Sequence, residues 1–245
     1  MSQIKLLQLN IEGSRHLSRV LPFLAEEGPD VLCLQEVYES DIPEIVQTLG
    51  NSIQYLFSPN LRTTKEGVVL VEGSIILSKH PITARITEYY TDKAGMLREY
   101  DHSTKETNRN TQSFSVTACD ILIHDLPFRI ATTHFTWTPD GKVDDFQRID
   151  VQSMLKVLKP MGELVLTGDF NAPRGGEIFS ILEREFTDNV PKEYLSSLDP
   201  HLHRVGHLEL MVDGIFSTPS YAVTDVAMIC GVSDHCALRA TVSKQ

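Results

Sequence analysis

The ends of the predicted strands constrain this chain more than any other feature. Apolar or alternating runs typical of strands occupy residues 4–9, 31–35, 68–78, 113–124, 128–134, 164–167, 210–216, 221–229 and 236–242. Six of these runs carry an acid, an amide or an imidazole at or near an end. These polar residues are Asn10, Glu36, His134, Asp169 with Asn171, Asp213, and Asp234 with His235. Because a buried charge is costly unless it is paired or binds a metal, their recurrence predicts a shared polar site.

Helical patterns are fewer than strand patterns and occur at residues 14–27, 42–49 and 144–158. The apolar stripe that we predict for the last of these helices consists of Phe146, Ile149, Met154, Leu155 and Leu158. Many strands and few helices, mixed along one chain, predict an α/β fold in which two sheets pack together and helices lie outside. Since no repeat, low-complexity tract or linker is evident in the sequence, we predict one domain over residues 1–245.

Two long polar segments, residues 91–112 and 189–206, fit neither pattern. Long polar loops on a rigid scaffold are frequent sites of substrate recognition. Arg109 and Asn110 stand where the first segment leads into a strand, and an arginine there can reach a phosphate. We therefore predict both as substrate-binding residues, with a solvated surface arginine as the equal alternative.

The charge balance limits the kind of ligand. The 22 Lys and Arg residues are outnumbered by 33 Asp and Glu residues, which gives a formal net charge of −11. Proteins that hold long duplex nucleic acid by its phosphates usually carry a basic stripe, and none is visible in the sequence. A small phosphate ligand is compatible with this charge, because a bound metal uses carboxylates and supplies positive charge of its own.

Four cysteines, Cys33, Cys119, Cys230 and Cys236, show no C-x-x-C spacing and lie in or beside apolar runs. We interpret them as small buried hydrophobic residues in a reducing compartment rather than as metal ligands or disulfide partners. The chain opens without a signal-peptide pattern, and no apolar run approaches the ~20 residues of a membrane span. We accordingly predict a cytoplasmic protein without membrane contact, with a monomer favoured.

The polar residues at the strand ends indicate a chemistry. Carboxylate and amide oxygens without a cysteine suit Mg²⁺ or Mn²⁺, and histidines exchange protons near physiological pH. Together they are the components of metal-assisted hydrolysis of a phosphate ester. Each motif alone has a simpler interpretation: the Asp169–Asn171 pair as a turn, Glu36 as an acid at a helix N-terminus, His134 as a structural strand residue, and 233–235 as a tight turn. Their combination in one chain favours the site.

In order along the chain, the motifs resemble those of the endonuclease/exonuclease/phosphatase family. This family includes pancreatic deoxyribonucleases, abasic-site endonucleases, neutral sphingomyelinases, inositol polyphosphate 5-phosphatases and tyrosyl-DNA phosphodiesterases. The matching motifs are Leu9-Asn10-Ile11, Pro29-Asp30-Val31-Leu32-Cys33-Leu34-Gln35-Glu36-Val37, Thr133-His134, Gly168-Asp169-Phe170-Asn171, Val212-Asp213 and Ser233-Asp234-His235. They span nearly the whole chain. The resemblance implies a four-layer α/β sandwich, with two mixed β-sheets packed face to face and flanked by helices.

The resemblance also implies a role for each polar residue. Glu36 would be the main Mg²⁺ ligand, with Asn10 beside it and Asp234 near the metal. Asp169 would align or deprotonate the attacking water, and Asn171 would steady that water and a phosphate oxygen. The phosphate would be contacted by His235, which Asp213 orients, and by His134 as a second histidine. Gly168 would permit a tight backbone there, and Phe170 would turn into the core so that its two polar neighbours face the phosphate.

The activity that follows is hydrolysis of a phosphodiester by metal-assisted water attack. Because of the acidic charge, we expect nucleic acid ends, short single strands or another small phosphodiester as substrate rather than long duplex DNA. One alternative is a catalytically silent binding protein on the same fold, which would be expected to lose Glu36, Asp169 or His235; all three are present. Others are a phosphomonoesterase and a phosphodiesterase of lipid headgroups. The lipid enzyme would need an exposed apolar hairpin, whereas we interpret residues 68–77 as a core strand.

Overall fold

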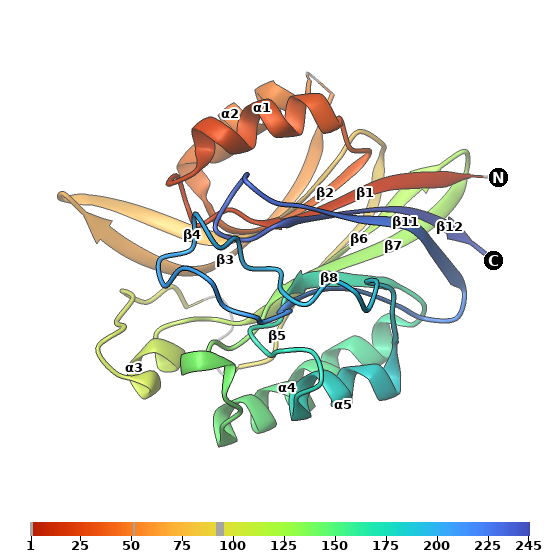
Figure 1. Ribbon diagram of the computed structural model, residues 1–245. Coiled ribbons are helices and arrows are strands. Elements are labelled where there is room, and N and C mark those ends of the chain that lie inside the picture. Colours follow the sequence, from red (N-terminus) through yellow and green to blue (C-terminus); the bar gives the residue numbers. More distant parts are fainter. Residues whose placement is uncertain (1, 51, 92–95) are drawn as a thin grey trace.

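The computed structural model describes residues 2–50, 52–91 and 96–245 and contains two mixed six-stranded sheets (Figure 1). The first sheet, in spatial order, consists of β11 (Tyr221–Ile229), β12 (Ala237–Lys244), β1 (Gln3–Asn10), β2 (Val31–Tyr38), β4 (Val68–Ser78) and β3 (Gln54–Lys65). The second consists of β5 (Ile82–Tyr89), β6 (Ser115–Ile123), β7 (Leu126–His134), β8 (Val165–Asp169), β10 (Asp213–Ser217) and β9 (Thr187–Asp188). Within them, β1 and β2 run parallel, as do β7 and β8, and the other neighbours run antiparallel.

Helices cover the outer faces of both sheets. In Figure 1, α1 (Leu17–Glu27) and α2 (Ile42–Leu49) lie above the first sheet, and α4 (Asp145–Leu158) and α5 (Glu177–Glu185) lie below the second. The remaining short elements are α3 (Lys105–Asn110) and the 3₁₀ turns at Glu39–Asp41, Pro139–Gly141 and Lys159–Met161. This helix–sheet–sheet–helix order confirms the predicted four-layer α/β sandwich.

Strand alternation divides the interior into layers. On β1, Ile4 and Leu6 pack in the core between the sheets, whereas Leu7 and Leu9 pack under α1 and α2. On β8, Val165 belongs to the core between the sheets, whereas Leu164 and Leu166 pack against α4 and α5. Side chains on a strand alternate between its two faces. The face of each of these strands that packs between the sheets therefore carries apolar residues at one end and polar residues towards the other. That layer therefore ends in a polar region at one side of the sandwich.

Among the described elements, three strands (β3, β5 and the two-residue β9) and two helices (α3 and α5) were not predicted, and they share a position at the margin of the fold. β3 and β5 are edge strands, and β3 is polar and half exposed along most of its length. An edge strand packs fewer neighbours, so it needs less apolar alternation and leaves a weaker pattern in the sequence. α3 and α5 have six and nine residues, too few for a strong helical period.

The predicted apolar stripe of α4 is partly wrong. Ile149 is 58% exposed, and the buried face of the helix includes two polar residues, Gln147 and Asp150. Asp150 accepts hydrogen bonds from Arg109 and from Thr136, and Gln147 donates to the backbone carbonyl groups of Thr136 and Asn171. Because these polar side chains find buried partners, the helix turns a partly polar face inward and leaves an isoleucine in solvent.

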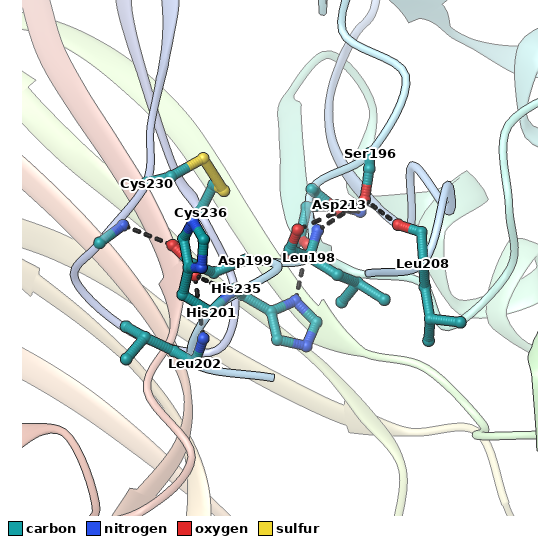
Figure 2. The surroundings of a disulfide bond; sticks show 12 residues. Ser196, Leu198, Asp199, His201, Leu202, Leu208, Asp213, Cys230, His235 and Cys236 are labelled. Carbon is teal, nitrogen blue, oxygen red and sulfur yellow. Dashed lines mark hydrogen bonds and ion pairs between the residues drawn. A yellow bond between two sulfur atoms is a disulfide. The ribbon is translucent and has the colours of Figure 1, made fainter. Parts of the chain in front are cut away.

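The cysteine prediction holds for two residues and fails for the other two. Cys33 and Cys119 are buried free thiols, whereas Cys230 and Cys236 form a disulfide (Figure 2). The last paired residues of β11 and β12 are Ile229 and Ala237, so the two cysteines occupy the next cross-strand position, with their Cα atoms 4.2 Å apart. The hairpin register therefore creates this bond, which spacing alone did not indicate. The compartment is not indicated by these cysteines, and a reducing one stays a prediction.

The hairpin of β3 and β4 projects from the body of the sandwich (Figure 1). At its tip Val68 and Val69 are each 59% exposed, whereas residues 73–78 are buried. The interpretation of residues 68–77 as a core strand is therefore wrong for the tip of the hairpin. Within the described residues, no helix is long and apolar enough to cross a membrane.

Candidate active site

Strand register brings the predicted site residues into two short rows. In the second sheet, Asp169 at the end of β8 stands between His134 at the end of β7 and Asp213 at the start of β10. In the first sheet, Asn10 at the end of β1 pairs in register with Gln35, the residue before Glu36. Because β1 runs parallel to β2 and β7 to β8, the two strands of each pair end at the same edge of their sheet. The site thus forms where the layer between the sheets turns polar.

Asn10 joins the two rows. Its side-chain Nδ2 donates to Glu36 Oε1 at 3.0 Å and to Asp169 Oδ2 at 3.1 Å. Its Oδ1 accepts the backbone N–H of Glu12 at 3.1 Å, which fixes the orientation of the amide. One amide group therefore holds a carboxylate of each sheet, and the two carboxylates converge on the same small region.

Two buried glutamines cross-link the sheets directly behind these carboxylates. Gln8 Nε2 donates to Gln35 Oε1 and to Asp213 Oδ1, both at 2.9 Å, and Gln35 Nε2 donates to Thr132 Oγ1 at 2.9 Å. All four residues are essentially inaccessible to solvent. Among the described residues, Gln8 Oε1 has no hydrogen-bond partner, but the four side chains are otherwise joined by direct hydrogen bonds. Buried hydrogen-bond networks restrict movement, so these bonds hold the two sheets together at the site. These glutamines were not predicted, although Gln8 and Gln35 follow the strand alternation of Ile4, Leu6 and Cys33.

His235 and Asp213 form a close pair. The imidazole Nδ1 lies 2.7 Å from Asp213 Oδ2, and its Nε2 lies 3.7 Å from Asp169 Oδ2. Burial opposes the charged imidazolium, but the charges of Asp213 and Asp169 outweigh burial and raise the pKa of His235 well above its ordinary value. With Nδ1 on Asp213, the Nε2 of His235 faces Asp169, which is the orientation that the predicted pairing implies.

His134 lies on the other side of the same carboxylates. Its Nε2 is 3.6 Å from Asp169 Oδ2 and 3.7 Å from Glu36 Oε1. The two histidines thus flank Asp169, and both present Nε2 to it. A phosphate bound in this region would meet imidazole groups from two sides.

The turn after β8 has the geometry that the sequence predicts. Gly168 has φ of +149°, and a Cβ there would lie 2.0 Å from the carbonyl oxygen of Thr133. Phe170 is fully buried against Phe216, whereas Asp169 Oδ1 accepts the backbone N–H of Asn171 at 2.8 Å. The Asn171 amide donates to the carbonyl oxygen of Phe135 at 2.9 Å. Only a glycine allows β8 to approach β7 this closely while both polar groups remain on the side of the site.

Three of the eight described non-glycine residues with positive φ lie in the same region. Glu12, Glu36 and Asn171 all have left-handed backbone conformations, with φ of +51°, +55° and +48°. Such conformations are unfavourable for residues other than glycine and persist where the surrounding structure enforces them. In β2 the register shifts between Leu34 and Val37, so Glu36 sits in an irregularity that turns its side chain out of the strand alternation.

Asp234 is near the site but has a different set of neighbours from Glu36. It forms a group with Glu12 and His16 in which one potential ligand atom of each lies within 4.8 Å of the others. Glu12 is also bound by Arg204 at 3.1 Å and by His16 at 3.0 Å. Glu12 was not predicted; its position two residues after Asn10, in the same strand-end segment, is the signal that could have indicated it.

A second unpredicted acid is Glu72 on β4. Burial raises the pKa of Glu72 to about 8, and the negative charge of Glu36 contributes to that rise. Burial likewise raises the pKa of Tyr100 to about 12, again with the charges of Glu36 and Glu72 contributing. The charge of Glu36 thus disfavours ionisation of Glu72, which indicates a region of negative potential that a cation would relieve.

Both polar segments border this region where the structure describes them. Tyr100 belongs to the segment 91–112, of which residues 92–95 lie outside the described residues. His203 belongs to the segment 189–206; burial lowers the pKa of His203, and the charges of Asp234 and His235 also act on it. Residues 98–100 pair with Arg62 of β3, and Leu198 forms a β-bridge with His235, so the two segments border the site at these two places.

Arg109 and Asn110 lie at the end of α3. Arg109 binds the buried Asp150 through two hydrogen bonds of 2.8 and 2.5 Å and stacks on the ring of Phe146 at 4.9 Å. Asp150 also accepts a hydrogen bond from Thr136, which lies two residues after His134. The carbonyl oxygen of Asn110 accepts from Arg98 at 2.6 Å. These contacts anchor α3 to α4 and to the strand that carries His134.

The arrangement combines carboxylate oxygens, two histidines and one amide at the edge of a rigid core. Carboxylate oxygens from Glu36 and Asp169 suit a hard divalent cation, and the half-buried Glu72 nearby favours one electrostatically. The amide of Asn10 turns its Nδ2 to these carboxylates and its Oδ1 to the N–H of Glu12. The paired imidazoles can stabilise or protonate an anionic group beside them. Such a site can activate a water molecule and stabilise a developing phosphorane.

The comparisons with known proteins agree with this geometry. The sequence profile of the Endonuclease/Exonuclease/phosphatase family matches residues 7–235. A comparison with curated proteins finds no match.

Solved structures share the fold. An endonuclease/exonuclease/phosphatase from Beutenbergia cavernae has a TM-score of 0.75 at 15% identity, over 100% of this chain and 72% of that chain. The catalytic domain of human nocturnin, with a bound sulfate anion, has a TM-score of 0.72 at 18% identity, over 100% and 94%. A mannosyl-6-phosphatase from Bacteroides thetaiotaomicron has a TM-score of 0.70 at 13% identity, over 98% and 99%.

Proposed function

This chain belongs to the endonuclease/exonuclease/phosphatase family, and on that basis we propose that it is a divalent-metal-dependent hydrolase of phosphodiesters. One observation carries the proposal: Glu36, Asp169 and His235, which come from three separate parts of the chain, converge around Asn10 and Asp213. A binding protein has no need for this combination of a cation site, a hydrogen-bond acceptor for water and an oriented imidazolium.

Glu36 and Asn10 are the residues that we expect to hold the metal, with Asp234 near it. The oxygen-rich donor set and the negative potential around Glu36 fit Mg²⁺, with Mn²⁺ as a substitute. When bound, such an ion supplies Lewis-acid stabilisation of the charge on the phosphate oxygens.

We expect Asp169 and Asn171 to act on the attacking water. Asp169 Oδ1 is occupied by the backbone N–H of Asn171, and Oδ2 is shared by Asn10 and the two histidines. Asp169 therefore aligns the water and accepts its proton at Oδ2. Asn171, which the carbonyl oxygen of Phe135 fixes in orientation, steadies that water and one phosphate oxygen.

His235 and His134 stabilise the phosphate. Asp213 binds Nδ1 of His235, so the Nε2–H of the imidazolium points to the substrate. The negative charge that grows on the phosphate oxygens during attack is then met by a fixed positive charge. His134 contributes a second donor from the opposite side of Asp169.

A generic diester tests the proposal. With bis-p-nitrophenyl phosphate as substrate, we expect turnover to require Mg²⁺ or Mn²⁺ and to stop in EDTA. Glu36→Ala should lower kcat by roughly 10²-fold or more, the scale expected for loss of a Lewis acid. Glu44→Ala, which removes an exposed carboxylate from α2, is the matched control and should leave turnover unchanged. Full activity of Glu36→Ala, or of the wild type in EDTA, would contradict the proposal.

We further propose that the substrate is a nucleic acid end, a short single strand or another small phosphodiester. The net charge of −11 repels a long polyanion, and three basic residues of the region around α3 are already paired with acids. These pairs are Arg109 with Asp150, Arg62 with Glu99, and Lys105 with Asp144. A groove that follows duplex DNA needs several cations directed at phosphates instead.

The salt dependence of binding tests this preference. Each duplex phosphate contact adds roughly −0.9 to the slope of log K against log salt. We expect Asp169→Asn, used as a binding-competent variant, to give a shallow slope with short oligonucleotides and weak binding to duplex DNA. A slope steeper than about −4, with tight duplex binding, would identify a groove-tracking nuclease instead.

A specific observation favours a lipid phosphodiester as the second candidate substrate. Val68 and Val69 form an exposed apolar tip on the projecting hairpin of β3 and β4 (Figure 1). Co-sedimentation with phosphatidylcholine vesicles distinguishes the candidates, with Val68→Ser/Val69→Ser as the variant. If the wild type binds the vesicles and this variant does not, a lipid headgroup is favoured as substrate. If the wild type does not bind the vesicles, the soluble phosphodiester is favoured.

A further inference from the structure

Residues 231–235 form the loop that carries Asp234 and His235, and a disulfide closes this loop at its base. Cys230 directly follows β11, Cys236 directly follows His235, and the two are bonded to each other (Figure 2). Of the pair, Cys230 is exposed to solvent and Cys236 is buried. The bond therefore joins an exposed residue to the residue next to the histidine of the site.

Asp199 holds the same loop through hydrogen bonds. Its Oδ2 accepts the backbone N–H of Gly231 at 2.6 Å, and its Oδ1 accepts those of His201 and Leu202 at 2.8 and 3.0 Å (Figure 2). Its own backbone N–H donates to the carbonyl oxygen of Asp234 at 2.8 Å. Asp199 is only 2% exposed, so a single buried carboxylate ties residues 196–206 to the loop of Asp234.

The disulfide and the hydrogen bonds of Asp199 are adjacent in space. A carboxylate oxygen of Asp199 and the sulfur atoms of Cys230 and Cys236 lie within 4.8 Å of one another. The backbone N–H of Cys236 donates to the carbonyl oxygen of Ser197 at 2.7 Å, and Leu198 forms a β-bridge with His235. Together, the disulfide and Asp199 constitute a clamp around residues 231–235. Nothing in the reaction chemistry proposed above uses these residues, although they enclose two of its side chains.

We propose that Asp199 and the Cys230–Cys236 disulfide are positioning residues for Asp234 and His235, and that a dithiol reductant lowers phosphoester hydrolysis by opening this clamp. The inference rests on the proposed function for its effect on catalysis. His235 reaches Asp213 from a loop, so its place depends on contacts that can be released without unfolding the sheets.

The redox step balances with a dithiol as the electron donor. One thiolate of the reductant attacks the sulfur of the exposed Cys230, and Cys236 leaves as a thiolate that takes up a proton. The second thiol of the reductant then displaces Cys230 as a thiol, and the reductant becomes a disulfide. Two electrons pass to the protein, which gains two thiols and loses the covalent closure of residues 231–235.

Enzyme kinetics in both redox states provide the first test. In the oxidised wild type, dithiothreitol should lower kcat on bis-p-nitrophenyl phosphate about 10-fold to 100-fold, because displacing a catalytic group by ~1 Å has effects of this size. Cys230→Ser should show the low kcat with and without dithiothreitol. Cys119→Ala removes a thiol outside the disulfide and should respond like the wild type. Asp199→Asn should lower kcat while its disulfide remains intact. An oxidised wild type that keeps its kcat in dithiothreitol would overturn the proposal.

Hydrogen exchange of the same proteins reports on the clamp independently of catalysis. Reduction, Cys230→Ser and Asp199→Asn should each accelerate amide exchange in residues 230–236 and 199–202, and leave β8 unchanged. Equal protection of residues 230–236 in both redox states would refute the clamp whatever the activity. Conversely, an oxidised wild type that hydrolyses no phosphodiester would refute the proposed function, and the exchange data would still decide on the clamp.

Discussion

Asp169 and His235 arrive at the same site by different means. Asp169 ends a central strand, where β7 and β10 fix it from both sides and Gln8 and Gln35 lock the sheets behind it. His235 lies in a loop between two strands and owes its place to Asp213 and to the clamp of Asp199 and the disulfide. A group held by strand register moves only if the sheet moves, whereas a group held by a loop depends on a few separable contacts. Substitutions in the strand-held half of the site, around Asp169, and in the loop-held half, around His235, should therefore have different effects.

The largest effect should come from the strand-held half. Asp169→Asn removes the proton acceptor but keeps the amide oxygen that binds the N–H of Asn171, so the fold should persist. We expect kcat to fall about 10³-fold, within the range for loss of a general base. Steady-state kinetics measure this, with Asp120→Asn, an acid paired with Arg129 in the same sheet, as a control of unchanged activity. A loss under tenfold would assign water activation to another group.

Asp213→Asn tests the link between the halves. The neutral amide leaves His235 without the charge that raises its pKa and fixes its tautomer. We expect kcat to fall about 10²-fold or more with little change in KM, since contacts that bind substrate remain. The double variant with His235→Ala should be no slower than His235→Ala alone. A raised KM with unchanged kcat would show that Asp213 does not act through His235.

Gly168→Ala should be the most damaging change to stability, because its Cβ would lie 2.0 Å from the carbonyl oxygen of Thr133. We expect a loss of about 3 kcal/mol or more in the free energy of unfolding, the size typical of disrupted packing in a core. Gly162→Ala is the matched control: φ is +71°, but no heavy atom lies within 4 Å, so only the backbone penalty of ~1 kcal/mol applies. Urea denaturation compares the two; equal losses would mean that the close approach of β7 and β8 is not needed.

The pair of His235 and Asp213 should make stability depend on pH. The folded-state pKa of His235 lies well above its ordinary value of 6.5, so folding binds the proton more tightly than the unfolded chain does. The resulting stabilisation should be complete below pH 6.5 and should be lost as pH rises through the folded-state pKa. The difference in unfolding free energy between wild type and Asp213→Asn, followed by urea denaturation, should shrink over that interval. A difference that grew with pH would reverse the assignment of charge.

The smallest effect should come from Arg204→Ala. Arg204 binds Glu12 at 3.1 Å from the segment that also contains Asp199, but its side chain is 71% exposed. Exposed ion pairs contribute about 0–1 kcal/mol, so we expect little change in stability or kcat. Urea denaturation and kinetics measure both. An effect as large as that of Asp199→Asn would show that surface charge, and not the buried clamp, holds the loop.

The sequence predicted most of the strand-held half. Asn10, Glu36, His134, Asp169 and Asp213 were recognised because each stands at a strand end, and parallel strands bring such ends together. The pattern was less informative at the margins, where edge strands β3 and β5 lack the burial that produces strong alternation. It also failed on the inner face of α4. Asp150 is buried there because Arg109 and Thr136 donate hydrogen bonds to it, and local periodicity does not reveal these partners.

By itself the sequence determined the sandwich, the order of its motifs and the polar residues at the strand ends, because these depend on local periodicity and on residue type. Only the tertiary structure decided that Cys230 and Cys236 are bonded, that Glu12 joins Asp234, and that Asp199 clamps the loop of His235. Each of these depends on residues that are distant in sequence or on the register of a hairpin. A disulfide or a buried hydrogen bond forms at distances of a few ångströms, and only the packing of the whole chain sets those distances.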